Sequence, residues 1–480
     1  MFHKLITKYG LATHLALLAS LPVVLQPFVS DRILGVTILW LSLFALLWLL
    51  VEPSILSGEH LSTARRRVRR EIARSPFFWF AVAAVVFAAI RCWNDSIVLR
   101  FNPEESAWQI SQPVLAFCPA SVPGAAFLPL ALSIGVGILL VGVLYGLGAA
   151  ARTSFGITFA LVLGVGGLAS SICACMGVES LLSSALTAFS VKPYLGTVHG
   201  IGCLVAVTCG VHAESRKWAA ARLPFCLGVA GNVAGVIFFA PPLVSGVYLL
   251  LTVFLAFFCF TFVSRTSSLG GMARSMIMFL FGVALALSLL LAFAPQAVSE
   301  AKSHGFDMAQ AFPEVYKQTV AVLKRIGGIV WKESPWCGAG IGAFPLQVQF
   351  LADKADWSIL PPQVVTAVSG YWTVLAERGI LGCMLLGGLG LILVFVWIRH
   401  LIGAIVHLRT KDDAYVFPFA CPPVVWISPL VLAVVCLEAV VAPVFSGKTV
   451  LLAIVAGMTL SAASFPRKPR RESSATDQEK

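Results

Sequence analysis

The residues best suited to chemistry gather in two short segments in the second half of the chain. Glu377 and Arg378 place a carboxylate beside a guanidinium where an apolar run begins. Upstream, residues 333–344 read ESPWCGAGIGAF, with three alternating glycines after a proline. Glycines spaced in this way let a backbone turn approach a bulky ligand and point N–H groups at it. The same spacing is typical of a tight turn that only tucks a loop against the protein, and both interpretations stay open.

A proton acceptor and several cations complete the set of candidates. Glu377 can serve as an acid, a base or an orienting group if the protein buries it. His199 suits proton transfer near neutral pH, although its position inside an apolar run is also typical of a hydrogen-bonded core histidine. The cations that could hold a phosphate, or could equally be solvated or snorkelling charges, are Lys192, Lys324, Arg325 and Arg378, with Arg91 and Arg100 in addition.

The elements that carry these residues read as membrane spans. Of the 480 residues, 59% are hydrophobic and 12% are charged, which is too few polar groups to clothe a soluble globule. We predict an all-α polytopic membrane protein with about twelve transmembrane helices, since each apolar run can cross a layer roughly 30 Å thick. The predicted spans are 11–29, 33–51, 76–93, 125–148, 156–175, 195–213, 222–240, 243–264, 275–294, 377–398, 423–443 and 449–466. The first reads as a retained span and not as a cleaved signal peptide.

The net charge of +12 follows the loops between spans, so we expect no nucleic-acid partner. Arg and Lys gather after alternate spans, which is the positive-inside bias of polytopic proteins. They lie at 65–74, 152, 216–222, 265–274, 399–411 and 467–471. This parity predicts that both termini are cytoplasmic. The basic stretch at 61–74 could also bind anionic lipid or a partner.

The same parity predicts the organisation of the chain. We expect a first bundle at 1–294, an extracytoplasmic loop at 295–370 between the ninth and tenth helices, a second bundle at 371–466, and a disordered cytoplasmic tail at 467–480. Apolar residues near helical spacing from 315 to 330 predict an amphipathic helix in the large loop, broken around Gly327 and Gly328. The shorter loop at 94–124 reads as an ordered cap without its own core.

The twelve cysteines do not indicate a metal site. Their spacings do not fit zinc, and most lie inside spans, where a thiol acts as a small apolar side chain. Cys118 and Cys337 fall in outer loops and could form a disulfide in an oxidising compartment. We expect neither a metal nor a cofactor.

In their order along the chain these pieces resemble the O-antigen ligase and O-antigen polymerase family, membrane glycosyltransferases that use undecaprenyl-diphosphate-linked glycans. Residues 331–344 are similar to the family's P-x-x-G-x-G-x-G-x-F turn through Pro335, Gly338, Gly340, Gly342 and Phe344. Residues 371–386, YWTVLAERGILGCMLL, are similar to its Y-L-x-x-L-A-E-x-G-x-x-G helix start. KPYLGTVHGIGCLVAV at 192–207 and PPLVSGVYLLL at 241–251 resemble its R-x-x-G-T-F-x-N-P-N and S-R-G-A span openings.

The resemblance implies a metal-independent, inverting glycosyltransferase of lipopolysaccharide or related cell-envelope synthesis, on the outer face of the bacterial inner membrane. The implied donor is an undecaprenyl-diphosphate-linked glycan, and the acceptor is a glycan end, lipid A-core or a protein hydroxyl. Glu377 and His199 are then the candidate catalytic residues. The candidate ligands of the diphosphate are Arg325 and Lys192 first, then Lys324 and Arg378.

The chain departs from the family at the proposed base. The family carries His-Asn nine and eight residues before the motif glutamate, where this chain has Val368 and Ser369. Gly246 replaces the arginine of S-R-G-A, and Lys192 keeps the charge of another arginine without its bidentate fork. The alternative function is therefore a non-catalytic or transport protein of the same pathway, such as a flippase or a degenerate scaffold. The scarcity of charge within the spans favours chemistry at the surface.

Overall fold

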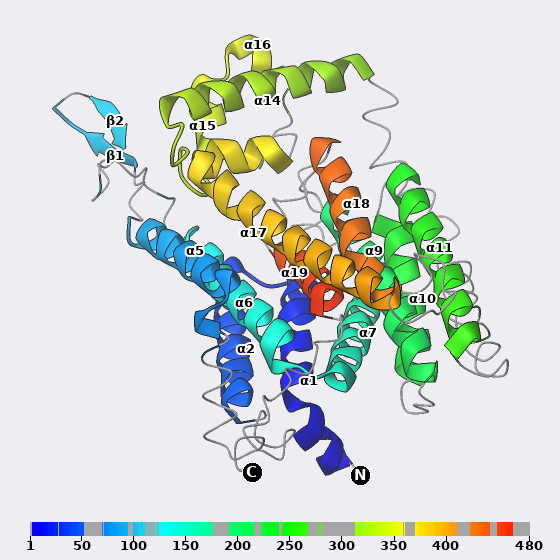
Figure 1. Cartoon of the computed structure of the whole chain (residues 1–480). Helices are drawn as coiled ribbons and strands as arrows, with labels where there is room; N and C mark the ends of the chain where they lie inside the picture. The colour runs from blue at the N-terminus through cyan, green and yellow to red at the C-terminus, as the bar shows by residue number, and fades with distance from the viewer. Residues whose placement is uncertain are drawn as a thin grey trace, which may run out of the picture.

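The protein is described here from a computed structural model of the whole chain (Figure 1). The described residues are 2–26, 28–51, 70, 72–94, 99–104, 106–110, 115, 121, 124–175, 192–215, 222–239, 242–266, 277, 280, 313–358, 360, 370–409, 423–441 and 449–463.

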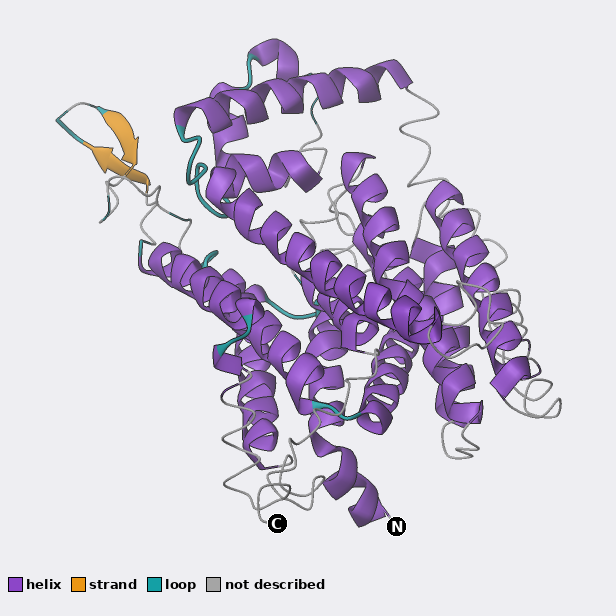
Figure 2. Ribbon diagram, viewed as in Figure 1, coloured by secondary structure: helices purple, strands orange, loops and turns teal. Residues whose placement is uncertain are grey.

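Helices make up almost all of the described structure, as the purple ribbons of Figure 2 show. In chain order they are α1 (Phe2–Leu25), α2 (Asp31–Val51), α5 (Pro76–Trp93), α6 (Phe127–Val141) with the π-helical turn η1 (Gly142–Gly146), α7 (Ala149–Cys175), α9 (Lys192–Ser215), α10 (Arg222–Phe239), α11 (Pro242–Thr266), α14 (Pro313–Glu333), α15 (Phe344–Leu351), α16 (Lys354–Trp357), α17 (Gly370–Arg409), the 3-10 turn η3 (Pro423–Trp426), α18 (Ile427–Val441) and α19 (Val450–Ala463).

The length and apolar composition of the described helices indicate a helical membrane protein. Among the described residues, five segments are long and apolar enough to cross a membrane: Asp31–Leu50, Pro76–Trp93, Phe127–Gly146, Ala151–Ser170 and Gly370–Gly403. The shorter apolar helices lie at Gly10–Leu25, Leu195–Val211, Leu223–Ile237, Gly246–Cys259, Pro423–Cys436 and Val450–Ala463. The span predicted at 275–294 falls almost entirely outside the described residues, so the number of twelve stays a prediction.

The core of the bundle depends on glycines that let helices touch. A Cβ atom on Gly231 of α10 would lie 1.9 Å from the carbonyl oxygen of Gly164 on α7. Such backbone contact is typical of membrane bundles, in which small residues replace the hydrophobic driving force between helices. Helix α19 runs through the same core, and nearly all of its residues are buried.

A β-hairpin follows α5. Strands β1 (Leu99–Asn102) and β2 (Ala107–Ile110) pair antiparallel, with Leu99 opposite Ile110 and Asn102 opposite Ala107. In Figure 1 the hairpin projects away from the helices. The sequence predicted an ordered cap in this loop but no strands, so the hairpin is a new element.

Helices α14, α15 and α16 form a cap over one end of the bundle, opposite the end at which α1 begins (Figure 1). Leu323, Ile326 and Val330 of α14 pack with Phe344 and Val348 of α15 in a separate hydrophobic cluster, which Leu360 and Ala376 complete. The cap residues 313–360 belong to the predicted large loop, whose residues 295–312 and 361–369 lie outside the described part. The boundaries between the four predicted segments stay predictions, and the tail at 467–480 also lies outside that part.

One prediction about α14 is wrong. The helix does not break around Gly327 and Gly328 but continues from Pro313 to Glu333. A Cβ atom on Gly327 would lie 3.8 Å from both Phe344 and Trp372, so this glycine sits against the cap's own packing. Burial of the apolar face outweighs the helix penalty of about 1 kcal/mol for each glycine.

A second correction concerns α17. The sequence predicted that a span starts at 377, whereas the helix begins at Gly370 and is interrupted at Gly379, where φ is 63° and ψ is −165°. We call residues 370–378 and 380–409 its first and second parts. Cys337 is a free cysteine, and Cys118 lies outside the described residues, so the disulfide prediction is not tested.

Candidate functional site

A glycine turn follows α14 and carries the first of the two predicted segments. We use this name for residues 334–343, between Glu333 and Phe344. Gly338, Gly340 and Gly342 have φ values of 69°, 114° and 73°, which place all three in the left-handed region that favours glycine. Phe344 then begins α15 with a fully buried side chain.

The interruption of α17 carries the second segment. In a continuous helix the N–H groups of Ile380 and Leu381 would donate to the carbonyls of Ala376 and Glu377. They donate instead to Pro335 and Trp336 of the glycine turn, at 2.9 and 3.0 Å. The two released carbonyls accept N–H groups from the same turn: Ala339 donates to Ala376 at 2.8 Å, and Gly340 donates to Glu377 at 3.2 Å.

The turn and the interrupted helix therefore satisfy each other's backbone groups, so the interruption leaves none of these four groups unpaired. The tight turn that sequence reasoning proposed as one of two interpretations is confirmed. Only glycine fits at the contact, because a Cβ atom on Gly338 would lie 2.5 Å from the Arg378 nitrogen, and one on Gly379 would lie 2.4 Å from the Trp336 oxygen.

Glu377 points its carboxylate into the glycine turn. The carboxylate accepts hydrogen bonds from the backbone N–H groups of Gly342 and Phe344. Arg378 and Arg91 lie close enough to interact with it electrostatically. A glutamate, two arginines and a turn of N–H groups thus meet at the start of α17, which is the kind of site that holds a proton and an anion together.

Arg91 approaches Glu377 from the other side, from the last turn of α5. The side chain is fully buried, and its Nη1 donates to the Glu377 carbonyl oxygen at 3.1 Å. Its guanidinium carbon lies 5.3 Å from the centre of the Phe87 ring. Sequence reasoning offered Arg91 as an additional phosphate-binding cation, but not as a partner of Glu377. The sequence signal for such a role is that Arg91 is a single charge at the end of an otherwise apolar span. A charge there is costly unless it is paired or solvated.

Arg378 ends the first part of α17, and its side chain runs along the second part. A Cβ atom on Gly382 would lie 2.2 Å from the Arg378 Cβ atom and 3.3 Å from its Cγ atom, so the arginine stem covers Gly382. The side chain therefore stays beside the first turn of the second part. Among the predicted site residues, Glu377, Arg378, Pro335, Gly338, Gly340, Gly342 and Phe344 all come together here.

His199 lies elsewhere, in the bundle. It is buried, and its Nδ1 lies 3.1 Å from Oδ1 of Asn232. Nδ2 of Asn232 donates to the carbonyls of Ala160 and Gly228 at 2.8 and 2.7 Å, so Oδ1 is the acceptor and Nδ1 of His199 carries the proton. The Phe239 ring stacks on the imidazole. The interpretation of His199 as a hydrogen-bonded core histidine is confirmed.

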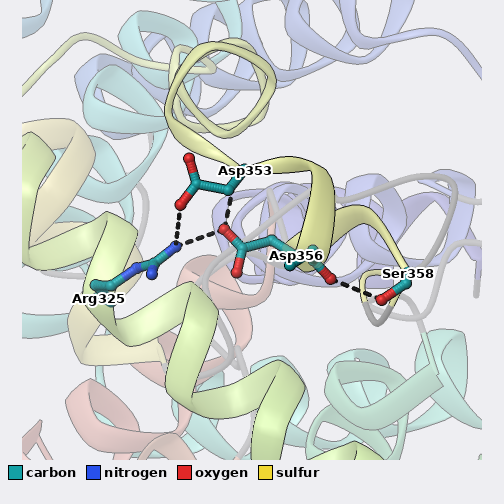
Figure 3. A network of polar contacts seen from close by, with 5 residues as sticks. Arg325, Asp353, Asp356 and Ser358 are labelled. Atoms are coloured by element: carbon teal, nitrogen blue, oxygen red, sulfur yellow. Dashed lines mark hydrogen bonds and ion pairs between the residues drawn. The ribbon is translucent and has the colours of Figure 1, made fainter.

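Arg325 lies on the outward face of α14 and contacts α16 (Figure 3). Its Nη2 donates to Asp356 and lies 3.8 Å from Asp353. Asp353 and Asp356 also form a capping box at the start of α16, in which the Asp353 N–H donates to Asp356 at 2.8 Å. Two carboxylates beside one guanidinium leave no surplus positive charge for a diphosphate.

The remaining predicted cations are less informative. Lys324 is exposed on α14. Lys192 begins α9, but its side chain lies outside the described part of the chain. Within that part, no group of three or more His, Cys, Asp or Glu side chains is arranged to hold a metal ion.

Comparison with known proteins assigns no family to the chain. No protein-family model matches it, and no curated protein matches it. The resemblance to O-antigen ligases and polymerases is therefore carried by the motif residues alone.

Proposed function

We propose that this protein is an O-antigen ligase-like membrane glycosyltransferase that transfers or polymerises an undecaprenyl-diphosphate-linked glycan. One observation carries the proposal. The two segments that resemble the family, Pro335–Phe344 and Ala376–Gly379, form one unit in which Glu377 lies between the N–H groups of the glycine turn and two arginines.

The reaction needs few groups. The oxygen of an acceptor hydroxyl forms a bond to the anomeric carbon of the donor sugar, while the bond from that carbon to the diphosphate oxygen breaks. The electron pair leaves with the lipid diphosphate, the hydroxyl proton goes to a base, and the anomeric configuration inverts. Cations that hold the leaving diphosphate and a positioned base suffice for this displacement.

We assign these roles to residues at the start of α17. Glu377 accepts the hydroxyl proton, and Arg378 and Arg91 supply positive charge for the diphosphate. One ionised Glu377 beside two guanidiniums leaves a net positive charge, which favours a diphosphate. Arg325 is placed outside the site in this proposal because Asp353 and Asp356 already neutralise it.

The setting follows from the charge pattern. We propose the bacterial inner membrane, both termini in the cytoplasm, about twelve spans, and the cap on the extracytoplasmic side. The acceptor is a glycan end, lipid A-core or a protein hydroxyl.

One observation favours a rival. An interrupted apolar helix is also typical of transporters, in which broken helices line the substrate site. The rival is a flippase-like protein that moves the same lipid-linked glycan without breaking a bond.

Gene deletion and complementation in the host separate the two functions. After deletion, the transferase proposal predicts that the surface polysaccharide loses its transferred or polymerised form and that lipid-linked glycan accumulates on the extracytoplasmic side. Glu377→Gln should fail to restore the polysaccharide, whereas Glu333→Gln, on an exposed position of α14, should restore it. Accumulation on the cytoplasmic side supports the flippase, and an unchanged polysaccharide contradicts both.

A further inference from the structure

The second part of α17 carries an uncovered apolar stripe along one side. We define the stripe as its exposed side chains Leu381, Met384, Leu391, Phe395, Ile398, Ile402 and Val406. At roughly 100° per residue these positions fall within about a quarter to a third of the helix circumference, so they form one face. Met384 is 62% exposed and Leu391 is 72% exposed, whereas Gly388, between them on the same face, packs against Phe80 of α5.

The stripe is long enough to cross a membrane. From Leu381 to Val406 the helix rises about 38 Å at 1.5 Å per residue, so a tilted helix can cross a hydrocarbon layer of roughly 30 Å. The exposed Arg399 lies near the far end, where a basic side chain can reach the headgroups. The stripe is therefore the part of α17 that lipid tails cover, and Leu381 marks the boundary on the side of the cap.

Trp336 lies at that boundary. Its carbonyl accepts the Leu381 N–H at 3.0 Å, so its backbone is fixed beside the end of the stripe. Its side chain is 64% exposed, although it is among the largest apolar groups of the cap. Tryptophan is enriched where the hydrocarbon layer meets the headgroups, because the ring is apolar and the indole N–H is polar.

We propose that Trp336 anchors the glycine turn in the lipid interface, with its ring among the phospholipid glycerol and headgroup atoms of the leaflet on the side of the cap. The occupant of this exposed surface is lipid, because the Trp336 backbone is fixed at the end of a stripe that is long enough to cross a bilayer. Glu377 lies four residues before Leu381, on the other side of the interruption at Gly379, and its carbonyl accepts the Gly340 N–H of the same turn. The anchored turn thus holds Glu377 beside the lipid interface.

This inference depends on the membrane spans and not on glycosyl transfer, so it can be tested without an activity. The whole chain is reconstituted in phospholipid vesicles whose acyl chains carry bromine near the headgroup or near the chain end. Since the protein has twelve tryptophans, the emission that Trp336→Phe removes isolates the signal of this one ring. Trp336→Leu should remove the same component of the emission. Agreement between the two variants shows that the loss comes from the Trp336 ring and not from a rearrangement in one variant.

Trp357→Phe is the matched control. Trp357 is also exposed, but it belongs to α16, which lies on the side of α14 away from α17 (Figure 1). For an interfacial ring we expect the Trp336 component to be quenched more strongly by bromine near the headgroup than by bromine near the chain end or by aqueous iodide. The Trp357 component should show the opposite preference.

Two results would overturn the proposal. Quenching of the Trp336 component by iodide and not by brominated lipid would place the ring in water. Resistance to both quenchers would mean that protein, such as a second copy of the chain, covers the surface.

Discussion

Gly338 and Gly379 face each other across the contact between the glycine turn and α17, and neither position admits a side chain. These two positions tolerate fewer substitutions than most, because four backbone hydrogen bonds depend on two left-handed glycines. Sequence reasoning could find the three glycines of the turn from their spacing. It could not find their partner, because AERGILG reads as an uninterrupted helix start and the partner lies far away in the chain.

Replacement of Gly338 by alanine should loosen the cap. The new Cβ atom would lie 2.5 Å from backbone atoms of Glu377, Arg378 and Gly379, and alanine disfavours a φ of 69°. We expect a loss of roughly 2–4 kcal/mol in the stability of the turn, from backbone strain and overpacking together. Thermal unfolding of the purified protein in detergent measures this. Gly328→Ala on α14 is the control, since open space surrounds that position; equal melting temperatures for both variants would contradict the described contact.

Arg325→Gln should cost little and should leave transfer intact. The arginine side chain is 50% exposed, so its pairs with Asp353 and Asp356 contribute less than about 1 kcal/mol after solvent screening. Asp356→Asn should cost more, because Asp356 is buried and also accepts the Asp353 N–H of the capping box. Complementation of a deletion strain reports transfer for both. If Arg325→Gln folds normally but fails to complement, the diphosphate role predicted from sequence for Arg325 is the better one.

At the element scale, the length of the apolar runs predicted where the described helices of the bundle lie, because burial in lipid or protein dominates every other preference there. Other features of the elements depend on tertiary contacts and on short local patterns that the apolar runs do not reveal. Gly327 and Gly328 weaken a helix locally, yet α14 continues because its apolar face packs on α15 and α17. The hairpin at 99–110 escaped prediction because no alternating pattern of sufficient length marks its two short strands.

The crossing of α7 and α10 gives a prediction at this scale. Gly231→Ala would place a Cβ atom 1.9 Å from the Gly164 carbonyl oxygen, and neither backbone can move without separating the helices. We expect a loss of roughly 3 kcal/mol or more, seen as a lower melting temperature and a lower yield of folded protein. Gly390→Ala on α17 is the matched control, because nothing lies within 4 Å of its added Cβ atom. A normal melting temperature for Gly231→Ala would show that the two helices do not pack this closely.

At the scale of the whole molecule, the cap and the beginning of α1 lie at opposite ends of the bundle (Figure 1). The charge pattern predicts that the large loop lies across the membrane from both termini, and this topology stays a prediction. Sequence could not predict that part of this loop forms a separate hydrophobic cluster on the start of α17, because the contacts join residues from 323 to 376.

Labelling of intact spheroplasts tests this arrangement. The exposed amines of Lys324, Lys332 and Lys354 in the cap should react with a membrane-impermeant reagent without permeabilisation, as peptide mass spectrometry would report. A variant with arginine at all three positions should lose the signal. Labelling of these lysines only after permeabilisation would put the cap in the cytoplasm and would remove the extracytoplasmic setting of the proposed reaction.

The central claim is that Glu377, held by the glycine turn and flanked by Arg91 and Arg378, supports glycosyl transfer. The most direct measurement is the release of lipid diphosphate from a purified undecaprenyl-diphosphate-linked glycan, with the protein in phospholipid vesicles and an acceptor glycan present. The account predicts one lipid diphosphate released for each glycosidic bond formed, and a rate at least roughly a hundredfold lower for Glu377→Gln, the scale expected for loss of a general base. Equal rates for the wild type and Glu377→Gln, or no release by the wild type, would contradict it.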